Sequence, residues 1–400
     1  MSDLESMLTF WRYVHKFFSN FTSTQHRDEF DRQFFELISE RSNYSTYAAF
    51  RKLLHCLNDA HTDVFPKDVI PLLSVGLKTK LIDSKCLVLN NLVQLRDSIP
   101  IGSEILLMNE QPIIEVMQNN LSQVSFSTRN HGISRVLKYL LSNRYSANPR
   151  IVINTPDGLR KEIVLESVFD LKTFPLSQSQ PSFDSIKNCY SRDTSYLYIP
   201  SFANESDIEL VIQELRKLAS ISKLIIDVRG NTGGNSVFAT KLLAILTHKQ
   251  LMGASWRSLS FNAFQVAYFH NLDPRQQAAN ASDWYVGKSE TVFPDRPISV
   301  NKICVLMDCE TISAAEDFLL YAKQIDNCVL IGETSAGSSG MPVNLDLGGN
   351  YWCQISAKHD FINEPHDFIR KGIKPDYEVY STADALGNRI DEQLEFALDW

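Results

Sequence analysis

The first residue of chemical interest is Ser313, which lies where a predicted strand gives way to a predicted helix. The apolar run from Ile303 to Met307 is typical of a buried strand, and apolar residues recur at helical spacing after Ser313. A helix N-terminus offers unpaired N–H groups and a partial positive charge, which would stabilise an oxyanion forming beside a serine hydroxyl. Ser313 and Glu316 also match a capping box, in which the two side chains satisfy backbone donors. This stretch alone leaves a nucleophile and a helix cap both open.

A glycine-rich loop is the second feature, with the sequence DVRGNTGGN from Asp227 to Asn235, between a predicted strand and a predicted helix. Gly233 and Gly234 would let backbone N–H groups approach a ligand closely. The loop lacks the G-K-[ST] ending of a phosphate loop, which argues against a nucleotide. An oxyanion hole and a tight turn without function both fit these glycines.

His61 is the third feature, in a predicted turn just beyond a helix that Asn58 and Asp59 end. A single histidine in a turn is most often structural or solvated. His359 and His366 are rival candidates for a base, and they lie in a polar segment close to the C-terminus.

Composition excludes several classes of protein. The 400 residues carry a formal net charge of -8 and no cluster of Lys or Arg, which argues against nucleic acid as the main partner. The seven cysteines show no C-x-x-C spacing and H-E-x-x-H is absent, so we predict no disulfide framework, no metal and no other cofactor.

The same sequence bears on localisation. No apolar run reaches the roughly 18 residues of a transmembrane helix. The N-terminal residues include acids where a signal peptide needs basic residues. The chain as given is therefore expected in the cytoplasm, and a periplasmic or extracellular protein is the alternative if a leader has been removed.

Four regions must position the candidate residues. Residues 1–66 show apolar residues at helical intervals and predict about three helices, and residues 67–118 show short strands and turns. Residues 119–188 predict a helix, a hairpin and a linker rich in Ser, Gln and Pro. Residues 189–400 alternate apolar strands with helices, which predicts an α/β domain whose sheet is covered on at least one face. Within it, residues 250–300 have no clear periodicity, so a lid, a substrate wall and a surface excursion all remain open.

The second region resembles a PDZ domain. Its turns and strand from Pro100 to Pro112 are similar to the PDZ phrase P-x-G-D-x-I-L-x-I-N-G, with Ser103 and Glu110 in place of the usual Asp and Gly. The resemblance implies a module that captures extended chains by strand addition.

The C-terminal region resembles the serine peptidase family of C-terminal processing (tail-specific) proteases and the tricorn core protease. Four phrases appear in the family's order over most of residues 195–380, namely LIIDVRGNTGGN, ETISAAEDF, VLIGETSAGSSG and GIKPDYEV. The resemblance implies Ser313 as nucleophile, and an oxyanion hole made by Ala314 with Gly233 or Gly234. It also implies a crotonase-like (ClpP/crotonase-type) α/β spiral core and a peptide or unfolded-protein substrate, and it leaves a homo-oligomer open.

The general base must differ from that of the processing branch, which uses a lysine about 25 residues beyond the serine. The matching position here is Ser338, whose neutral hydroxyl is a poor base near pH 7. The tricorn-like branch instead uses a histidine in a phrase resembling L-x-D-x-H-T, and Leu57 to Thr62 fit that phrase. This resemblance implies His61 as base.

The orienting acid of that branch is missing from its usual position, where residues 369–371 are Ile, Arg and Lys. Glu364 is our candidate for this role, with Asp367 as a substitute, and the third member could also be absent. The sequence thus predicts a serine peptidase that works through a Ser313 acyl-enzyme with His61 as base. The alternative is a catalytically inactive member of the same scaffold that binds peptides or other ligands.

Overall fold

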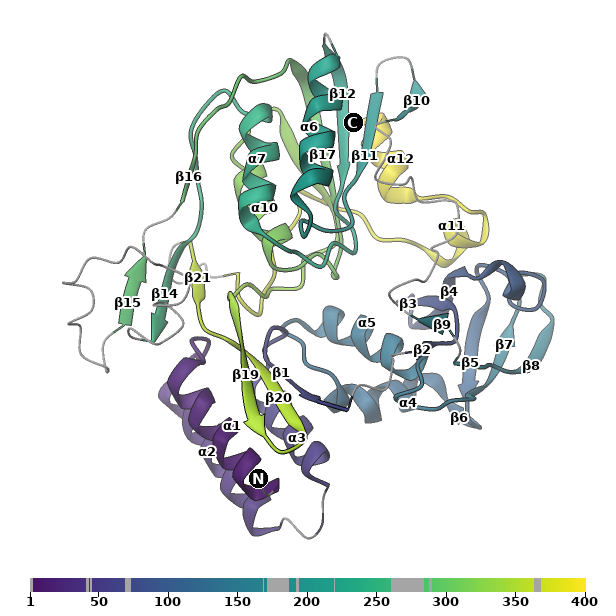
Figure 1. The fold of residues 1–400 in the computed structure, drawn as a ribbon. Coiled ribbons are helices and arrows are strands. Elements are labelled where there is room, and N and C mark those ends of the chain that lie inside the picture. Colours follow the sequence, from purple (N-terminus) through teal and green to yellow (C-terminus); the bar gives the residue numbers. More distant parts are fainter. Residues whose placement is uncertain are drawn as a thin grey trace.

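The computed structural model describes residues 3–40, 43, 45–68, 73–167, 169–170, 187–191, 194–218, 220–259, 284–287, 290–362 and 368–400. They form three parts, which are an N-terminal helical part, a β-rich module and an α/β core (Figure 1). The expected linker up to residue 186 and the stretch 260–283 lie outside the described residues.

The N-terminal part contains the three expected helices, α1 (Asp3–Phe17), α2 (Thr24–Ser39) and α3 (Thr46–Leu57). The hydroxyls of Ser23 and Ser45 cap the second and third. Their apolar faces form one core with a three-stranded sheet made of β1 (Asp63–Pro66), β20 (Tyr351–Ser356) and β19 (Pro342–Gly348). The N-terminal helices therefore pack against strands from the far end of the chain.

The β-rich module is a sheet with the strand order β3-β4-β5-β7-β8 and two helices packed on it. Its buried apolar core runs from Val75 to Leu165. The predicted hairpin is present, with Gly158 at φ +83 in its turn, where glycine tolerates a positive φ. The elements are β3 (Leu77–Ile82), β4 (Lys85–Asn91), β5 (Glu104–Met108), β6 (Gln111–Pro112), α4 (Ile113–Asn120), α5 (Arg129–Leu140), β7 (Arg150–Asn154) and β8 (Arg160–Val164).

The α/β core is built on a six-stranded sheet with the order β10-β11-β12-β17-β18-β22. The five strands from β11 to β22 are parallel, and β10 pairs with β11 antiparallel. The strands are β10 (Lys187–Ser191), β11 (Thr194–Tyr198), β12 (Ile221–Asp227), β17 (Val300–Met307), β18 (Cys328–Gly332) and β22 (Tyr377–Glu378).

Helices cover both faces of this sheet, which explains why its central strands are apolar throughout. One face of β17, with Ile303 and Val305, packs on α6 (Glu205–Lys217), α7 (Ser236–Leu246) and α10 (Ala314–Ala322). The other face, with Cys304 and Leu306, packs on α12 (Glu392–Asp399), as Figure 1 shows. Successive strand residues alternate between the two cores because side chains in a strand point to opposite faces.

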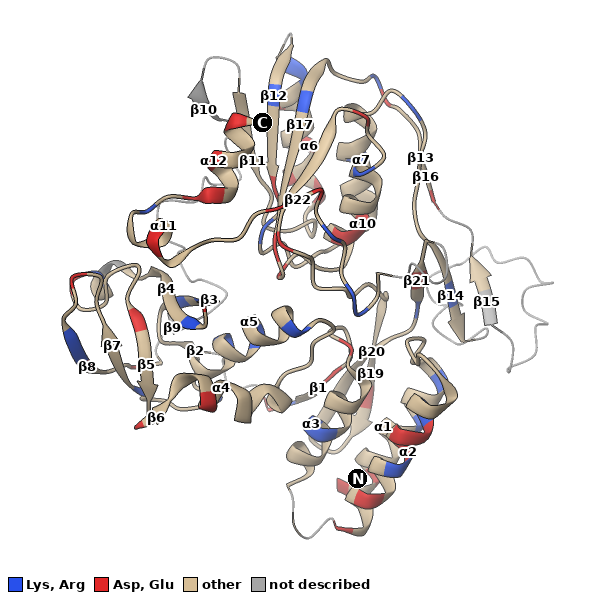
Figure 2. Ribbon diagram, turned by 180° about the vertical axis from the view of Figure 1, so that it is seen from behind, with Lys and Arg blue, Asp and Glu red and all other residues tan. Residues whose placement is uncertain are grey.

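Small elements complete the described chain. They are β2 (Leu73–Ser74), β9 (Phe169–Asp170), β13 (Leu251–Met252), β14 (Ser255–Leu259), β15 (Trp284–Gly287), β16 (Thr291–Val292), β21 (His359–Phe361), α11 (Ala383–Gly387) and the 3-10 turns Val93–Leu95 and Leu121–Gln123. Lys, Arg, Asp and Glu are interspersed over all three parts (Figure 2). Among the described helices, none has the length and apolar character needed to cross a bilayer.

Candidate active site

Ser313 is the N-cap of α10 and lies in the turn between β17 and that helix. Its backbone has φ +64 and ψ -130, a conformation that is rare for residues other than glycine. The predicted capping-box arrangement with Glu316 is present, and the Ser313 N–H lies 3.4 Å from Glu316 Oε2. The turn thus holds a partly exposed serine at the positive end of a helix, in a backbone conformation typical of nucleophile turns.

Gly233 packs directly against Ser313. A Cβ atom added to Gly233 would lie 2.5 Å from Ser313 Cβ and 3.1 Å from the Ala314 nitrogen, so only glycine fits here. The Gly233 N–H itself donates to Asn231 Oδ1 at 2.8 Å. Of the three predicted oxyanion donors, those of Gly234 and Ala314 have no acceptor among the described residues.

Ser338 joins Ser313 to His61. Its carbonyl oxygen accepts the Ser313 N–H at 3.0 Å, and its hydroxyl lies 2.7 Å from His61 Nδ1. Ser338 is fully buried, so this hydroxyl has little access to water. The structure therefore brings the two predicted residues to opposite sides of one serine, the residue that replaces the lysine of the processing branch.

Asp59 organises the turn that carries His61. Its Oδ1 accepts the His61 backbone N–H at 3.0 Å, and it also accepts the hydroxyls of Thr62 and Ser356 at 3.0 and 2.7 Å. Its Oδ2 accepts from the amide of Asn20 at 2.6 Å. A buried carboxylate with four donors fixes the turn after α3, so the orientation of His61 depends on it.

Burial lowers the pKa of His61 below 6.5, and the nearby charge of Arg135 lowers it further. The charge of Asp59 acts in the opposite direction and raises this pKa. His61 is thus held in its neutral form at neutral pH, which is the form that can accept a proton.

Glu316 lies beneath the loop that carries Ser338. Its carboxylate accepts the N–H groups of Gly337 and Ser338, both at 2.8 Å, and the hydroxyl of Ser335. Burial raises the pKa of Glu316 to about 8, against the effect of these donors. The side chain therefore holds the Ser338 loop and the start of α10 together.

Arg370 lies in the stretch where the resemblance predicts an orienting acid, and its guanidinium caps the end of α3. It donates to the carbonyl oxygens of Leu57 at 2.7 Å, Asn58 at 3.0 Å and Asn20 at 2.9 Å. This contact stabilises the C-terminus of the helix that leads to His61. Glu364, the predicted acid, lies outside the described residues, as do Asp367 and His366.

The rival base His359 is buried on β21, and its Nδ1 lies 2.8 Å from Asn20 Oδ1. It belongs to the network around Asp59, because Asn20 contacts both residues. In the described part of the chain, no group of three or more His, Cys, Asp or Glu residues is arranged to hold a metal ion.

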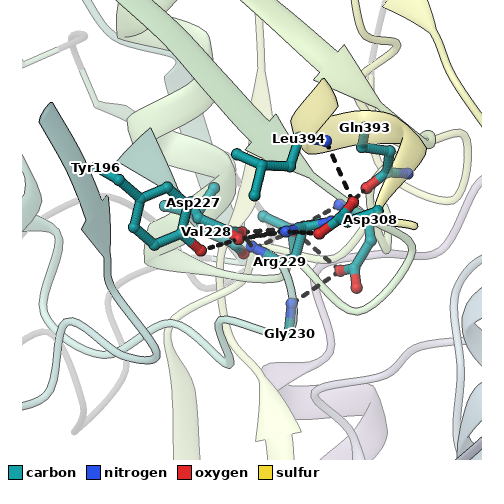
Figure 3. A network of polar contacts seen from close by, with 10 residues as sticks. Tyr196, Asp227, Val228, Arg229, Gly230, Asp308, Gln393 and Leu394 are labelled. Carbon is teal, nitrogen blue, oxygen red and sulfur yellow. Dashed lines mark hydrogen bonds and ion pairs between the residues drawn. The ribbon is translucent and has the colours of Figure 1, made fainter. Parts of the chain in front are cut away.

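An ionic network anchors the start of the glycine-rich loop (Figure 3). The guanidinium of Arg229 pairs with buried Asp227 at 2.6 Å and with Asp391, just before α12, at 2.8 Å. Tyr196 donates its hydroxyl to Asp227 at 2.6 Å, and Asp308 accepts the Gly230 N–H at 2.9 Å. The network ties the loop to the last helix of the chain.

Sequence reasoning did not single out Asp59 or Glu316 as site residues, and it considered Ser338 only as a replaced base. Asp59 stands inside the phrase that points to His61, and Glu316 stands inside the capping box. The phrase and the capping box are therefore the sequence signals from which these two residues could have been found. No local pattern could have joined Ser338 to His61, since 277 positions separate them.

Comparisons with known proteins identify similar sequences and folds. Residues 193–379 match the model of peptidase family S41. The fold is similar to mature CPAF complexed with lactacystin, with a TM-score of 0.75 and 15% identity over 99% of this chain and 97% of that one.

Two further solved structures share the fold. One is a putative peptidase from Parabacteroides merdae, with a TM-score of 0.56 and 14% identity over 100% of this chain and 96% of that one. The other is the photosystem II D1 C-terminal processing protease, with a TM-score of 0.50 and 16% identity over 97% and 98% of the two chains. No curated protein matches the chain in sequence.

Proposed function

We propose that the chain is an active serine peptidase acting on peptides or unfolded proteins. The premise is that residues 193–379 belong to peptidase family S41. The observation that carries the proposal is the double contact of Ser338, with the Ser313 backbone on one side and the His61 ring on the other. Acyl transfer needs a serine in a strained turn, a neutral histidine and free backbone donors beside them.

In the proposed mechanism, the Ser313 oxygen attacks the carbonyl carbon of the scissile peptide bond. His61 Nε2 accepts the hydroxyl proton and later gives it to the leaving amine. Nδ1 of His61 lies 2.7 Å from the Ser338 hydroxyl. The mechanism requires the tautomer in which Nδ1–H donates to that hydroxyl, because this tautomer leaves the lone pair of Nε2 free. Water then attacks the acyl carbon, with His61 again accepting a proton. His61 returns this proton to the Ser313 oxygen as the ester bond breaks and the acid product leaves.

The oxyanion of each tetrahedral intermediate would be bound by the N–H groups of Ala314 and Gly234. Both have no other acceptor among the described residues, whereas the Gly233 N–H is engaged by Asn231. Gly233 contributes instead by its lack of a side chain, which lets the loop lie against Ser313. The dipole of α10 adds to this stabilisation.

We also propose the finer assignments of the two folded units. Repeated βα units with helices on both faces of the parallel sheet support a crotonase-like core, and the β-rich module with α4 and α5 supports a PDZ-like domain. Glu364 remains our prediction for the third member of the relay. Glu364→Gln should then lower the rate of Ser313 acylation, whereas an unchanged rate would remove Glu364 from the mechanism.

A fluorophosphonate probe tests the proposal, because it reacts with an activated serine whatever the natural substrate is. We expect the wild type to label and both Ser313→Ala and His61→Ala to lose labelling, by a factor of about 100 or more for the histidine variant. Ser339→Ala is the control, because Ser339 lies in the same loop but its hydroxyl donates to Asp360. Full reactivity of His61→Ala would assign the base to another residue.

The inactive alternative is favoured by one observation, which is that Arg370 lies in the stretch where the resemblance predicts an orienting acid. An inactive member would keep the fold and bind peptides without cleaving them. The absence of labelling at every pH from about 6 to 9, where an imidazole base should work, would overturn the peptidase proposal in favour of this alternative.

A further inference from the structure

Helix α5 of the β-rich module contacts both of the segments that carry the proposed catalytic pair. Arg135 donates to the carbonyl oxygen of Ala60, the residue before His61, at 3.2 Å. On the next turn, Lys138 Nζ lies 2.6 Å from Glu310 Oε1, and the Ser134 hydroxyl donates to the same carboxylate. Glu310 stands three positions before Ser313, so one helix joins the two segments.

The Glu310 carboxylate links the position of α5 to the position of the Ser313 turn. It is only 12% exposed, and it belongs to the loop between β17 and Ser313. Asp308 accepts the Glu310 N–H at 3.0 Å, and the N–H of Ile312 donates to the carbonyl oxygen of Asn231 at 3.1 Å. A shift of Glu310 would therefore move the Ser313 turn against the glycine-rich loop.

A second ion pair from the module reaches the other catalytic loop. Lys80 on β3, the edge strand beside α5, pairs with Glu333, whose side chain is 6% exposed. Glu333 begins the loop that leads to Ser338, and its N–H donates to the Met307 carbonyl oxygen at 3.1 Å. The module thus supplies a lysine to each of the two loops that meet at Ser313.

A pocket of about 230 Å³ is lined by Lys80 and Glu333, which form one of these ion pairs. Its lining comes from both the module and the core, and includes Lys80, Ser134, Cys309, Glu333 and Tyr380. Because its walls mix cations, carboxylates and apolar atoms, the pocket by itself selects no ligand.

We infer that α5 and β3 position the catalytic pair, with Lys138 and Lys80 holding the Ser313 and Ser338 loops in register with the His61 turn. The inference rests on the proposed function, and it makes the β-rich module part of the catalytic apparatus. In Figure 2, basic positions lie along the α5 ribbon, on the side of the β-rich module that is nearer to the core and the N-terminal helices. These lysines are positioning residues, because they touch carboxylates of the loops and no reacting atom.

The test compares Lys138→Met with Lys85→Met. Both lysines belong to the module and are about equally exposed, at 55% and 52%, but the ion pair of Lys85 among the described residues is with Glu104 inside the module. We expect Lys138→Met to lower the rate of fluorophosphonate acylation about tenfold, and hydrogen exchange in residues 308–313 to become faster by a similar factor. Lys138→Arg should restore both to within about twofold, because the charge and its reach are kept. Lys80→Met should likewise make hydrogen exchange in residues 333–338 faster.

Equal acylation and exchange rates in Lys138→Met and Lys85→Met would overturn the inference. Faster exchange with an unchanged acylation rate would also overturn it, since the contact would then be structural only. Slower acylation without faster exchange would contradict positioning through the loop. If the wild type does not label at all, the proposed function fails, and the exchange rates still decide whether α5 orders the Ser313 loop.

Discussion

Ser338 stands where the resemblance to the processing branch predicts a lysine base. A serine cannot replace a lysine as a base, yet its hydroxyl is 2.7 Å from the His61 ring and its carbonyl oxygen holds the Ser313 N–H. The residue therefore connects the proposed base to the proposed nucleophile. This role depends on geometry and hydrogen bonding, and not on the pKa of the side chain.

Replacing Ser338 by Ala should slow acylation of Ser313 by about 10- to 100-fold, because the His61 Nδ1–H loses its acceptor and the imidazole can adopt the wrong tautomer or orientation. Stability should fall by only about 1 kcal/mol, the usual net worth of one hydrogen bond. Labelling kinetics and thermal unfolding measure the two effects. An acylation rate equal to that of the wild type would show that His61 is oriented without Ser338.

The acylation rate should fall as the pH drops through the His61 pKa, because only the neutral imidazole accepts a proton. Burial lowers this pKa from 6.5, so the midpoint of the acid limb should lie below 6.5. Labelling rates between about pH 4.5 and 8 provide the measurement, with circular dichroism at each pH to exclude acid unfolding. A midpoint above 6.5 would contradict a buried His61 as base.

At the scale of the elements, the site forms where three loops meet after parallel strands. The loops following β12, β17 and β18 carry Gly233, Ser313 and Ser338, and neighbouring parallel strands deliver all three to the same edge of the sheet. The sheet sets the spacing of the three loops, and hydrogen bonds between the loops set their conformations. The fit of Gly233 against Ser313 is the contact that joins two of these loops most directly.

Gly233→Ala should reduce acylation more than 100-fold and destabilise the fold by about 3 kcal/mol or more, since its Cβ would meet Ser313 Cβ at 2.5 Å. Gly158→Ala is a matched control, because Gly158 has a similar φ of +83 but nothing within 4 Å of an added Cβ. Gly158→Ala should lower the free energy of unfolding only by the strain of a positive φ, about 1 to 2 kcal/mol. Ser313 should keep its full reactivity in this variant. Chemical denaturation and labelling separate crowding from strain. Equal losses in both variants would refute the packing argument.

Local patterns in the sequence predicted much of this level of structure. The strand before Ser313, the helix after it, the three N-terminal helices and the hairpin ending in β8 are all present, because periodicity and turn residues act over short distances. The contacts that join Ser338 to His61 and Arg370 to α3 link residues more than 270 positions apart. Periodicity carries no information on such pairs, so the sequence suggested His61 only through its family phrase.

At the scale of the whole molecule, the last helix is joined to the catalytic loops by ionic contacts as well as by packing. Arg229 lies between buried Asp227 and Asp391, so it connects the glycine-rich loop to α12 (Figure 3). Gln393 in the same helix accepts from Arg229 at 3.1 Å. The C-terminus thus contributes to the order of the site although it is remote from Ser313 in the chain.

Arg229→Met should destabilise the protein by about 3 to 5 kcal/mol, because it leaves the carboxylate of Asp227 buried without its cation. Arg216→Met is the control, since Arg216 pairs with Asp295, which is 60% exposed. This variant should lower the free energy of unfolding by about 1 kcal/mol. Denaturant unfolding measures both variants. Similar losses of stability would show that the Arg229 network is no more important than a surface pair.

The pairing of β1 with β20 has a consequence for the synthesis of the chain. Asp63 is in register with Gln354, so the strand that follows His61 pairs with a strand that is made nearly 300 residues later. A ribosome-bound chain that ends at residue 340 would already carry both His61 and Ser313, and would still lack the strand that pairs with β1. The order of synthesis therefore delays the contact between the His61 turn and the Ser313 side of the molecule until β20 has been made.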